Sequence, residues 1–212
     1  MNVLLVVAAI LTSMRLAATS AGFQTSATRR DSASAASPHW PRGAVVPTWV
    51  DPEDMPPGAA ELVALAMRAW TTAAEGRFTL LNTTAESRAK LRVHFIRSPG
   101  KFGETLPLVD PRSGDIVGAE VGIAVDIDTR GDALERGIIT YLTALHEIGH
   151  ALGLPHRDNF NSIMYLFRYP TDSERYFGRY RARLRSPNDI GSPSATGLWA
   201  EDIEVLRALY DR

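Results

Sequence analysis

The sequence contains no cysteine among its 212 residues. Disulfides, thiol nucleophiles and thiolate metal sites are therefore excluded, and any metal must be held by His, Asp or Glu. An excess of charge is also absent, because 23 Lys and Arg stand against 24 Asp and Glu. The formal charge of −1 gives no overall field that attracts nucleic acid or acidic lipid, so we expect neither as a partner. The hydrophobic share of 45% predicts one globular domain of medium size.

No apolar run is long enough to span a bilayer as a helix. The apolar run at residues 3–11 has the length of the centre of a secretory signal. Small residues at Thr19 and Ala21 fit a cleavage site, so residues 1–21 are predicted to be a signal peptide that directs secretion. The alternative is an uncleaved apolar tail, which would keep the protein in the cell envelope.

A change of composition near Trp40 marks the predicted start of the folded domain. The Ser/Ala/Thr-rich sequence before it predicts a linker or short pro-segment over residues 22–39. From Trp40 onward, hydrophobic periodicity predicts strands and helices in succession. The predicted strands are residues 44–50, 78–81, 91–95 and 121–127. The predicted helices are one through residues 62–73, one over 138–152 and one over 200–210. Residues 98–115 are predicted to be a loop rich in Gly and Pro.

The predicted helix over residues 138–152 carries a potential metal site. His146 and His150 are four residues apart, so both imidazoles lie on one helix face and can reach a single ion. Glu147 lies on the neighbouring flank, close enough to hold a metal-bound water without being a ligand. Gly153 can adopt the left-handed conformation that ends a helix, which would bring His156 back as a third ligand. Three ligands leave a fourth position open, as in a catalytic zinc site.

Two other interpretations of this pattern remain open. The first is a surface helix that merely carries histidines. Against it, the expected number of accidental matches with three His, one Glu and one Gly at these offsets is on the order of 10⁻⁵ per chain of this length. The other is a zinc-binding module that has lost catalysis, although Glu147 is retained.

The pattern HExxHxxGxxH, followed by Met164 eight residues after the third His, resembles the metzincin zinc endopeptidases. Within that group the chain is most similar to the matrixins, by the spacing to Met164-Tyr165 and by residues 199–210. The resemblance implies an α+β, zincin-like fold with a twisted, mostly parallel five-stranded sheet, an antiparallel edge strand and an active-site helix. It also implies a catalytic domain over residues 40–212, with an upper subdomain at 40–153 and a small C-terminal subdomain at 154–212.

The resemblance implies roles for the site residues as well. The three histidines would hold one catalytic zinc ion, and Glu147 would be the general base acting on the zinc-bound water. Met164 would form a hydrophobic floor beneath the histidines. Leu142, one helical turn before His146, and Tyr165 are predicted to shape the substrate pocket, with plain core packing as the alternative for Leu142.

Some residues depart from the matrixin pattern. Arg157 follows the third His, where matrixins usually carry a small hydroxyl residue. Latency by a cysteine switch is impossible without cysteine, and a second, structural zinc is not expected because only His39 and His94 remain. We predict that His94 is an exposed strand residue and not a ligand. Asp126 and Asp128 stand where matrixins bind calcium, so calcium is a candidate cofactor, but a solvated strand end explains two acids better.

Residues 166–197 form a long segment with six arginines and three acidic residues. The six are Arg168, Arg175, Arg179, Arg181, Arg183 and Arg185. The segment is predicted to form a wall of the specificity pocket. Its arginines are interpreted in two ways: they give the pocket a preference for acidic substrate residues, or they belong to a solvated basic loop. The sequence thus predicts a secreted, monomeric zinc metalloendopeptidase that cleaves protein or peptide substrates. The alternatives are a metzincin-like zinc-binding module without turnover and an envelope-processing protease of narrow specificity.

Overall fold

The computed structural model describes residues 37–126 and 132–212. The predicted signal peptide, most of the predicted linker and Asp128 lie outside the described residues. Within the described part of the chain, no helix is long and apolar enough to cross a membrane. Five strands and four α-helices follow one another along these residues.

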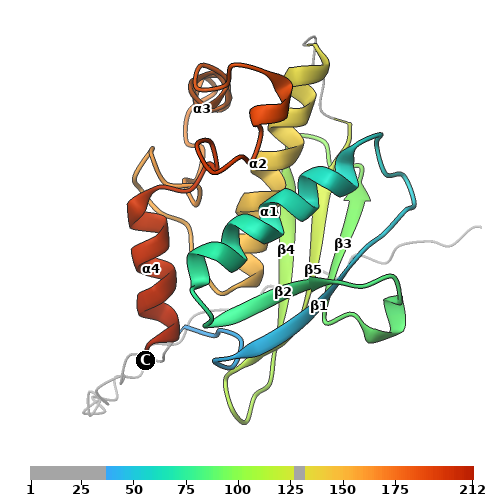
Figure 1. Ribbon diagram of the computed structural model, residues 1–212, viewed down its shortest axis with the longest axis vertical. Coiled ribbons are helices and arrows are strands. Elements are labelled where there is room, and N and C mark those ends of the chain that lie inside the picture. The colour runs from blue at the N-terminus through green and yellow to red at the C-terminus, as the bar shows by residue number, and fades with distance from the viewer. Residues whose placement is uncertain (1–36, 127–131) are drawn as a thin grey trace, which may run out of the picture. The chain divides into compact units, whose positions relative to one another are not determined.

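The strands form one twisted sheet of five members in the order β2-β1-β3-β5-β4 (Figure 1). Their bounds are Ala44–Val50 (β1), Phe78–Asn82 (β2), Leu91–Ile96 (β3), Gly103–Val109 (β4) and Ile116–Ala124 (β5). β1 is parallel to β2 and β3, and β3 is parallel to β5. β4 runs antiparallel to β5 and forms one edge of the sheet. The predicted α+β fold, with a mostly parallel sheet and an antiparallel edge strand, is confirmed.

Two long helices pack against the sheet and against each other. The helices are Ala59–Ala74 (α1), Ala133–Ala151 (α2), Asp172–Arg181 (α3) and Ala200–Tyr210 (α4). α1 crosses in front of α2 in Figure 1. The indole Nε1 of Trp70 in α1 donates to the carbonyl of Leu145 in α2 at 2.8 Å, and both residues are fully buried. A buried indole needs such a partner, so this bond fixes how the two helices cross.

The alternation of β3 separates the core from the outer face of the sheet. Leu91, Val93 and Phe95 are buried in the hydrophobic core, whereas Arg92 and His94 lie on the opposite face. Successive strand side chains point to opposite faces, so the alternating pattern in the sequence translates directly into this arrangement. The prediction of a strand at residues 91–95 is therefore confirmed.

Two predictions about irregular segments were wrong. Residues 98–115 contain β4. The sequence did not indicate this strand because Gly103 and Thr105 face α2, while Leu106 and Leu108 are 71% and 63% exposed. Residues 166–197 are not a simple loop, because they include α3. The apolar residues of α3 stand among arginines, which hid its helical period. β5 also begins earlier than predicted, at Ile116.

Candidate active site

α2 and the turn that follows it bring the three histidines together. His146 and His150 lie one turn apart on α2, and their Nε2 atoms are 3.1 Å from each other. The Nε2 atom of His156 is also 3.1 Å from that of His150. All three predicted ligands are therefore within reach of one ion, with their nitrogens inside 4.8 Å of one another.

Gly153 makes this return of the chain possible. It has a φ of 96°, in the left-handed region that residues with a Cβ rarely adopt. Leu154 N–H donates back to the carbonyl of Gly149 at 3.0 Å, which closes the helix end and redirects the chain toward His156. A Cβ at Gly153 would also collide with the carbonyl oxygen of Pro38. The glycine of the sequence motif is thus required by both its backbone angle and its surroundings.

The hydrogen bonds of the rings make these nitrogens suitable for a metal. The Nδ1 atom of His146 lies 2.6 Å from the carbonyl oxygen of Ile163, and that of His150 lies 2.8 Å from the carbonyl oxygen of Leu154. A carbonyl only accepts, so both Nδ1 atoms must be donors and both Nε2 lone pairs face the common centre. Tetrahedral zinc with Zn–N bonds of 2.0–2.1 Å places its nitrogens about 3.3 Å apart. The donor set therefore fits a zinc ion.

Burial shifts the three imidazoles toward the neutral form that binds metal, although His156 is the most exposed of them. Burial, together with the nearby His150, lowers the pKa of His146 to about 4. Burial also lowers the pKa of His150 and of His156. A metal ligand must be deprotonated at the coordinating nitrogen, so these shifts favour binding.

A buried turn beneath the histidines contains Met164. The Asp202 carboxylate, at the start of α4, accepts hydrogen bonds from the backbone N–H of Ile163 at 3.2 Å and from the hydroxyl of Ser162 at 2.5 Å. Met164 packs so closely on α2 that a Cβ at Gly149 would lie 2.5 Å from its Sδ atom. Met164 therefore lies against the helix that carries His146 and His150, and its role as an apolar support under the site stays a prediction.

Glu147 lies beside the histidines and against the edge strand β4. Its side chain is buried, with 6% of the residue exposed. Burial raises the pKa of Glu147 to about 7. The hydroxyl of Thr105 opposes this rise by donating a hydrogen bond to the carboxylate, and the negative charge of Glu104 reinforces the rise. Thr105 was missed because it lies in the segment predicted to be a loop. A strand assignment for that segment would have directed attention to its small and hydroxyl residues.

A cavity of about 920 Å³ opens beside the histidines and Glu147. Leu142 and Tyr165 both line this cavity, and Leu142 is also buried in the core with 2% exposed. Their role in shaping a substrate pocket stays a prediction. Tyr165 donates through its hydroxyl to Asp172 at 3.0 Å, which fixes the ring. Leu142 thus belongs both to the cavity wall and to the core, and Tyr165 is held in place on the wall.

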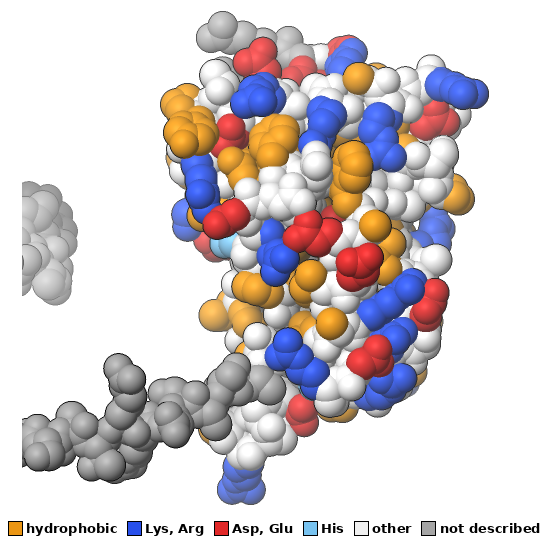
Figure 2. All heavy atoms as spheres, turned by 90° about the vertical axis from the view of Figure 1, so that its left-hand side faces the viewer, with side chains coloured by type: hydrophobic (Ala, Val, Ile, Leu, Met, Phe, Trp, Pro, Cys, Tyr) orange, Lys and Arg blue, Asp and Glu red, His pale blue; other side chains and the backbone are white. Residues whose placement is uncertain are grey.

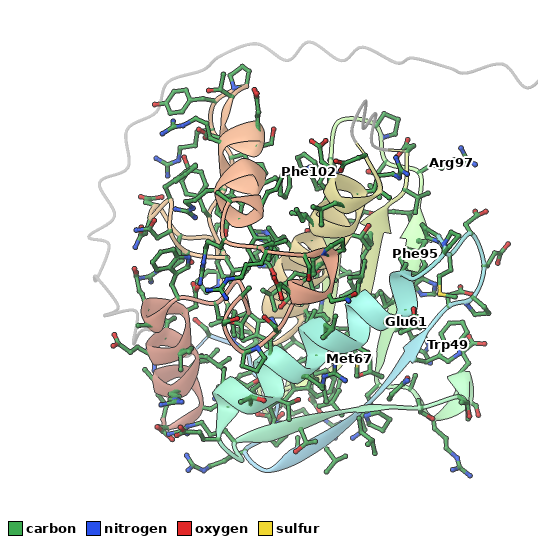
Figure 3. All side chains as sticks on the ribbon, turned by 45° about the horizontal axis from the view of Figure 1, so that its top comes forward. Trp49, Glu61, Met67, Phe95, Arg97 and Phe102 are labelled. Atoms are coloured by element: carbon green, nitrogen blue, oxygen red, sulfur yellow. The ribbon has the colours of Figure 1, made fainter. Side chains whose placement is uncertain are left out.

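Three aromatic residues that the sequence did not single out also line the cavity. Phe102, labelled in Figure 3, precedes β4 and packs edge to face on Phe167 and on Phe177 of α3, with ring centroids 5.7 and 5.1 Å apart. Phe102 is distant in sequence from its two partners, so local periodicity could not reveal this contact. Together the three rings give the cavity an apolar wall.

The arginines of residues 166–197 are largely engaged with other side chains. Figure 2 shows this side of the molecule, where Lys and Arg side chains lie between hydrophobic ones. Arg168 pairs with Asp158, and Arg181 pairs with Asp132 at 2.7 Å. The guanidinium of Arg179 lies 4.9 Å from the ring centroid of Phe160. These contacts favour a solvated basic face over a dedicated acid-binding pocket.

Three further predicted positions lie away from the histidine cluster. His94 is not the exposed residue that the sequence suggested, because its side chain is only 34% exposed and its nitrogens lie 2.9 Å from Asp51 and from Glu120. Asp126 accepts a hydrogen bond from the backbone N–H of Ser98 at 3.1 Å, and no observation supports calcium there. Arg157, the unusual residue after the third His, pairs with Glu201 at 2.8 Å.

The sheet, the helix that carries His146 and His150, and the turn through Met164 agree with the arrangement that the metzincin resemblance implied. The family model of the matrixins, peptidase M10, matches residues 52–177, and the chain belongs to this family. Matrix metalloproteinase-20 of Homo sapiens is 29% identical over 154 residues, a stretch that covers 70% of this chain. The same stretch is 27% of that relative, so the similarity concerns about a quarter of its length.

Proposed function

We propose that this matrixin is a secreted, zinc-dependent endopeptidase that hydrolyses peptide bonds. The observation that carries the proposal is the convergence of three histidine Nε2 atoms next to the buried carboxylate of Glu147, at the mouth of an apolar cavity. A structural zinc site is closed by four protein ligands, whereas three ligands beside an open cavity leave room for water and substrate.

The three histidines and Glu147 have separate roles in the proposed reaction. A zinc ion bound by His146, His150 and His156 would supply a Lewis acid that polarises the scissile carbonyl and lowers the pKa of water. Glu147 takes a proton from the attacking water and delivers it to the leaving amine. The Nδ1 hydrogen bonds to Ile163 and Leu154 keep two of the imidazoles oriented through this cycle.

The substrate would lie in an extended conformation along the outer edge of β4. This strand pairs only with β5 among the described strands, so its outer edge can bind a peptide backbone. The cavity beyond Glu147 suits a large apolar side chain next to the cleaved bond, because Leu142, Phe102 and Phe177 line it. The preference for acidic residues remains the weaker hypothesis, and a peptide library without enrichment of Asp or Glu would remove it.

Export and domain organisation complete the proposal. We infer a signal peptide at residues 1–21, a linker or short pro-segment at 22–39 and a monomeric catalytic domain at 40–212, divided after Gly153.

The test compares the purified wild-type protein with Glu147→Ala on a denatured protein substrate, with zinc content measured on the same samples. The proposal expects about one zinc per chain in both proteins and cleavage by the wild type alone. Zinc in both without cleavage by the wild type would favour a binding module or a protease of narrow specificity. Cleavage that persists in Glu147→Ala would remove the assigned role of Glu147.

A further inference from the structure

Glu147 rests on two residues of the edge strand β4. Gly103 and Thr105 are two positions apart, so they face the same side of the strand. A Cβ at Gly103 would lie 2.7 Å from Cγ and 2.9 Å from Oε1 of Glu147, which shows that the carboxylate side chain occupies the space that another residue would fill. Gly103 therefore provides room for Glu147, and Thr105 provides a hydrogen-bond donor.

The hydroxyl of Thr105 has two acceptors on the same residue. Its Oγ1 atom lies 2.7 Å from Oε2 of Glu147 and 2.9 Å from the backbone carbonyl oxygen of Glu147. A hydroxyl has one proton, so it donates to one acceptor at a time. An ionised carboxylate is the stronger acceptor, and the carbonyl already lies within the hydrogen-bonded interior of α2. The shorter contact is therefore the dominant one when Glu147 is ionised.

The two carboxylate oxygens of Glu147 are thereby made different. Oε2 is held by Thr105, whereas Oε1 lies beside Gly103 and forms no hydrogen bond with any described residue. Both Gly103 and Thr105 line the cavity. A general base needs one oxygen that is free to take a proton and a fixed orientation relative to the reacting water.

We propose that Thr105 is a positioning residue, which holds Glu147 by Oε2 so that Oε1 is the atom that takes the proton. This inference rests on the proposed peptidase function. Thr105 does not touch the substrate's reacting atoms in this scheme. It restricts the rotation of the Glu147 carboxylate, whose alignment controls the reaction rate. A small displacement of a catalytic group can lower that rate on the order of 100-fold.

The first test is the pair Thr105→Val and Thr105→Ser in the full-length protein. Valine keeps the branched shape without the hydroxyl, and serine keeps the hydroxyl without the methyl group. We expect Thr105→Val to lower kcat at least about tenfold with KM and zinc content near the wild-type values, and Thr105→Ser to restore most of kcat. Equal losses in both variants, or a loss confined to KM, would overturn the proposal.

A second test separates the two acceptors without using activity. Thr105→Val, Glu147→Ala and the double variant form a cycle, with the melting temperature of the zinc-free protein as the readout. If the hydroxyl bonds to the carboxylate, the effect of Thr105→Val will shrink or change sign once Glu147 is alanine. If it bonds only to the backbone carbonyl, which alanine retains, the effect of Thr105→Val will be the same in both backgrounds and the proposal fails.

The outcomes also distinguish this inference from the proposed function. An inactive wild-type protein would contradict the peptidase proposal, while the cycle would still report whether Thr105 holds the Glu147 carboxylate. An active wild type whose kcat is unchanged in Thr105→Val would leave the peptidase proposal standing and would refute the positioning role.

Discussion

The carboxylate of Asp202 accepts a hydrogen bond from the backbone N–H of Ile163 at 3.2 Å. The carbonyl of the same Ile163 accepts from Nδ1 of His146 at 2.6 Å. A buried acid at the start of α4 is thus linked, through one peptide residue, to the first of the three converging imidazoles. Groups outside the ligand set that are hydrogen-bonded to it orient the metal ligands, and their mutation typically costs about 10- to 100-fold in metal affinity.

Replacing Asp202 tests this link. Asp202→Ala leaves the N–H groups of Ile163 and Trp199 and the hydroxyl of Ser162 without their acceptor. We expect a loss of folding free energy on the order of 3 kcal/mol, since each buried orphan group costs about 1–3 kcal/mol. Zinc affinity should fall about 10- to 100-fold.

Asp202→Asn is the matched control, because its amide oxygen can still accept from the backbone N–H groups. It should retain more stability and more zinc affinity than Asp202→Ala, as measured by urea unfolding and by a competing chelator. A large loss of stability in Asp202→Ala with unchanged zinc affinity would contradict the link to His146.

Two glycines within helices offer a matched pair for the packing of Met164. Ala at Gly149 would place its Cβ 2.5 Å from the Met164 Sδ atom and 3.1 Å from the Trp70 ring, whereas Ala at Gly178 of α3 would meet nothing within 4 Å. Gly178→Ala should stabilise the protein by about 0.5–1 kcal/mol through helix propensity. Gly149→Ala should destabilise it by about 1–3 kcal/mol through overpacking.

Thermal unfolding of both variants checks the sign of each effect. If Gly149→Ala were as stabilising as Gly178→Ala, the close seating of Met164 on α2 would be incorrect.

The sequence allowed prediction wherever a local pattern determined the structure. Buried and partly exposed residues alternate strictly along β3. The spacing from His146 to His156 places the three rings on one helix and the turn that follows it. In both cases neighbouring residues carry the whole signal, so no knowledge of distant contacts was needed. The close approach of the three nitrogens follows from the helix repeat and from the left-handed angle at Gly153.

Features that depend on distant contacts were not predictable in this way. β4 has small or polar residues toward α2 because Glu147 occupies that space, and an inverted pattern of this kind resembles a loop in the sequence. Phe102 and Phe177 are far apart in the sequence and come into contact only in the folded protein. The partners of His94, Asp51 and Glu120, come from two other strands or strand ends, so its environment is set by the order of the sheet.

His94 predicts a pH dependence of stability. Burial opposes protonation of His94, but the hydrogen bonds and charges of Asp51 and Glu120 outweigh it and raise the pKa above the ordinary 6.5. Glu120 also pairs with Arg92 at 3.1 Å. Because the pKa in the folded state is raised, the folded state binds the proton more tightly than the unfolded state. This contribution is fully present below about pH 6.5 and is lost as the pH rises through the folded-state pKa.

The measurement is urea unfolding of the wild type and of His94→Gln between about pH 6 and pH 9. The stability advantage of the wild type over His94→Gln should decrease as the pH rises. Parallel stability curves over this range would show that the raised pKa does not contribute to folding.

Removal of the metal should lower stability through the same three histidines. A ligand that binds only the folded protein adds about 2.7 kcal/mol at a free concentration one hundred times its Kd. A strong chelator should therefore lower the melting temperature of the wild type, and added zinc should restore it. His150→Ala removes the central nitrogen, which lies 3.1 Å from both others, so its melting temperature should not respond to the chelator.

Calcium provides the second comparison in this experiment. Imidazole nitrogens are poor ligands for calcium, which prefers oxygen, so calcium should not restore the chelated wild type. Recovery with calcium alone would indicate a separate site built from carboxylates and carbonyls, and would revive the sequence-based candidate at Asp126. A response of His150→Ala to zinc equal to that of the wild type would instead show that the stabilising ion binds away from α2.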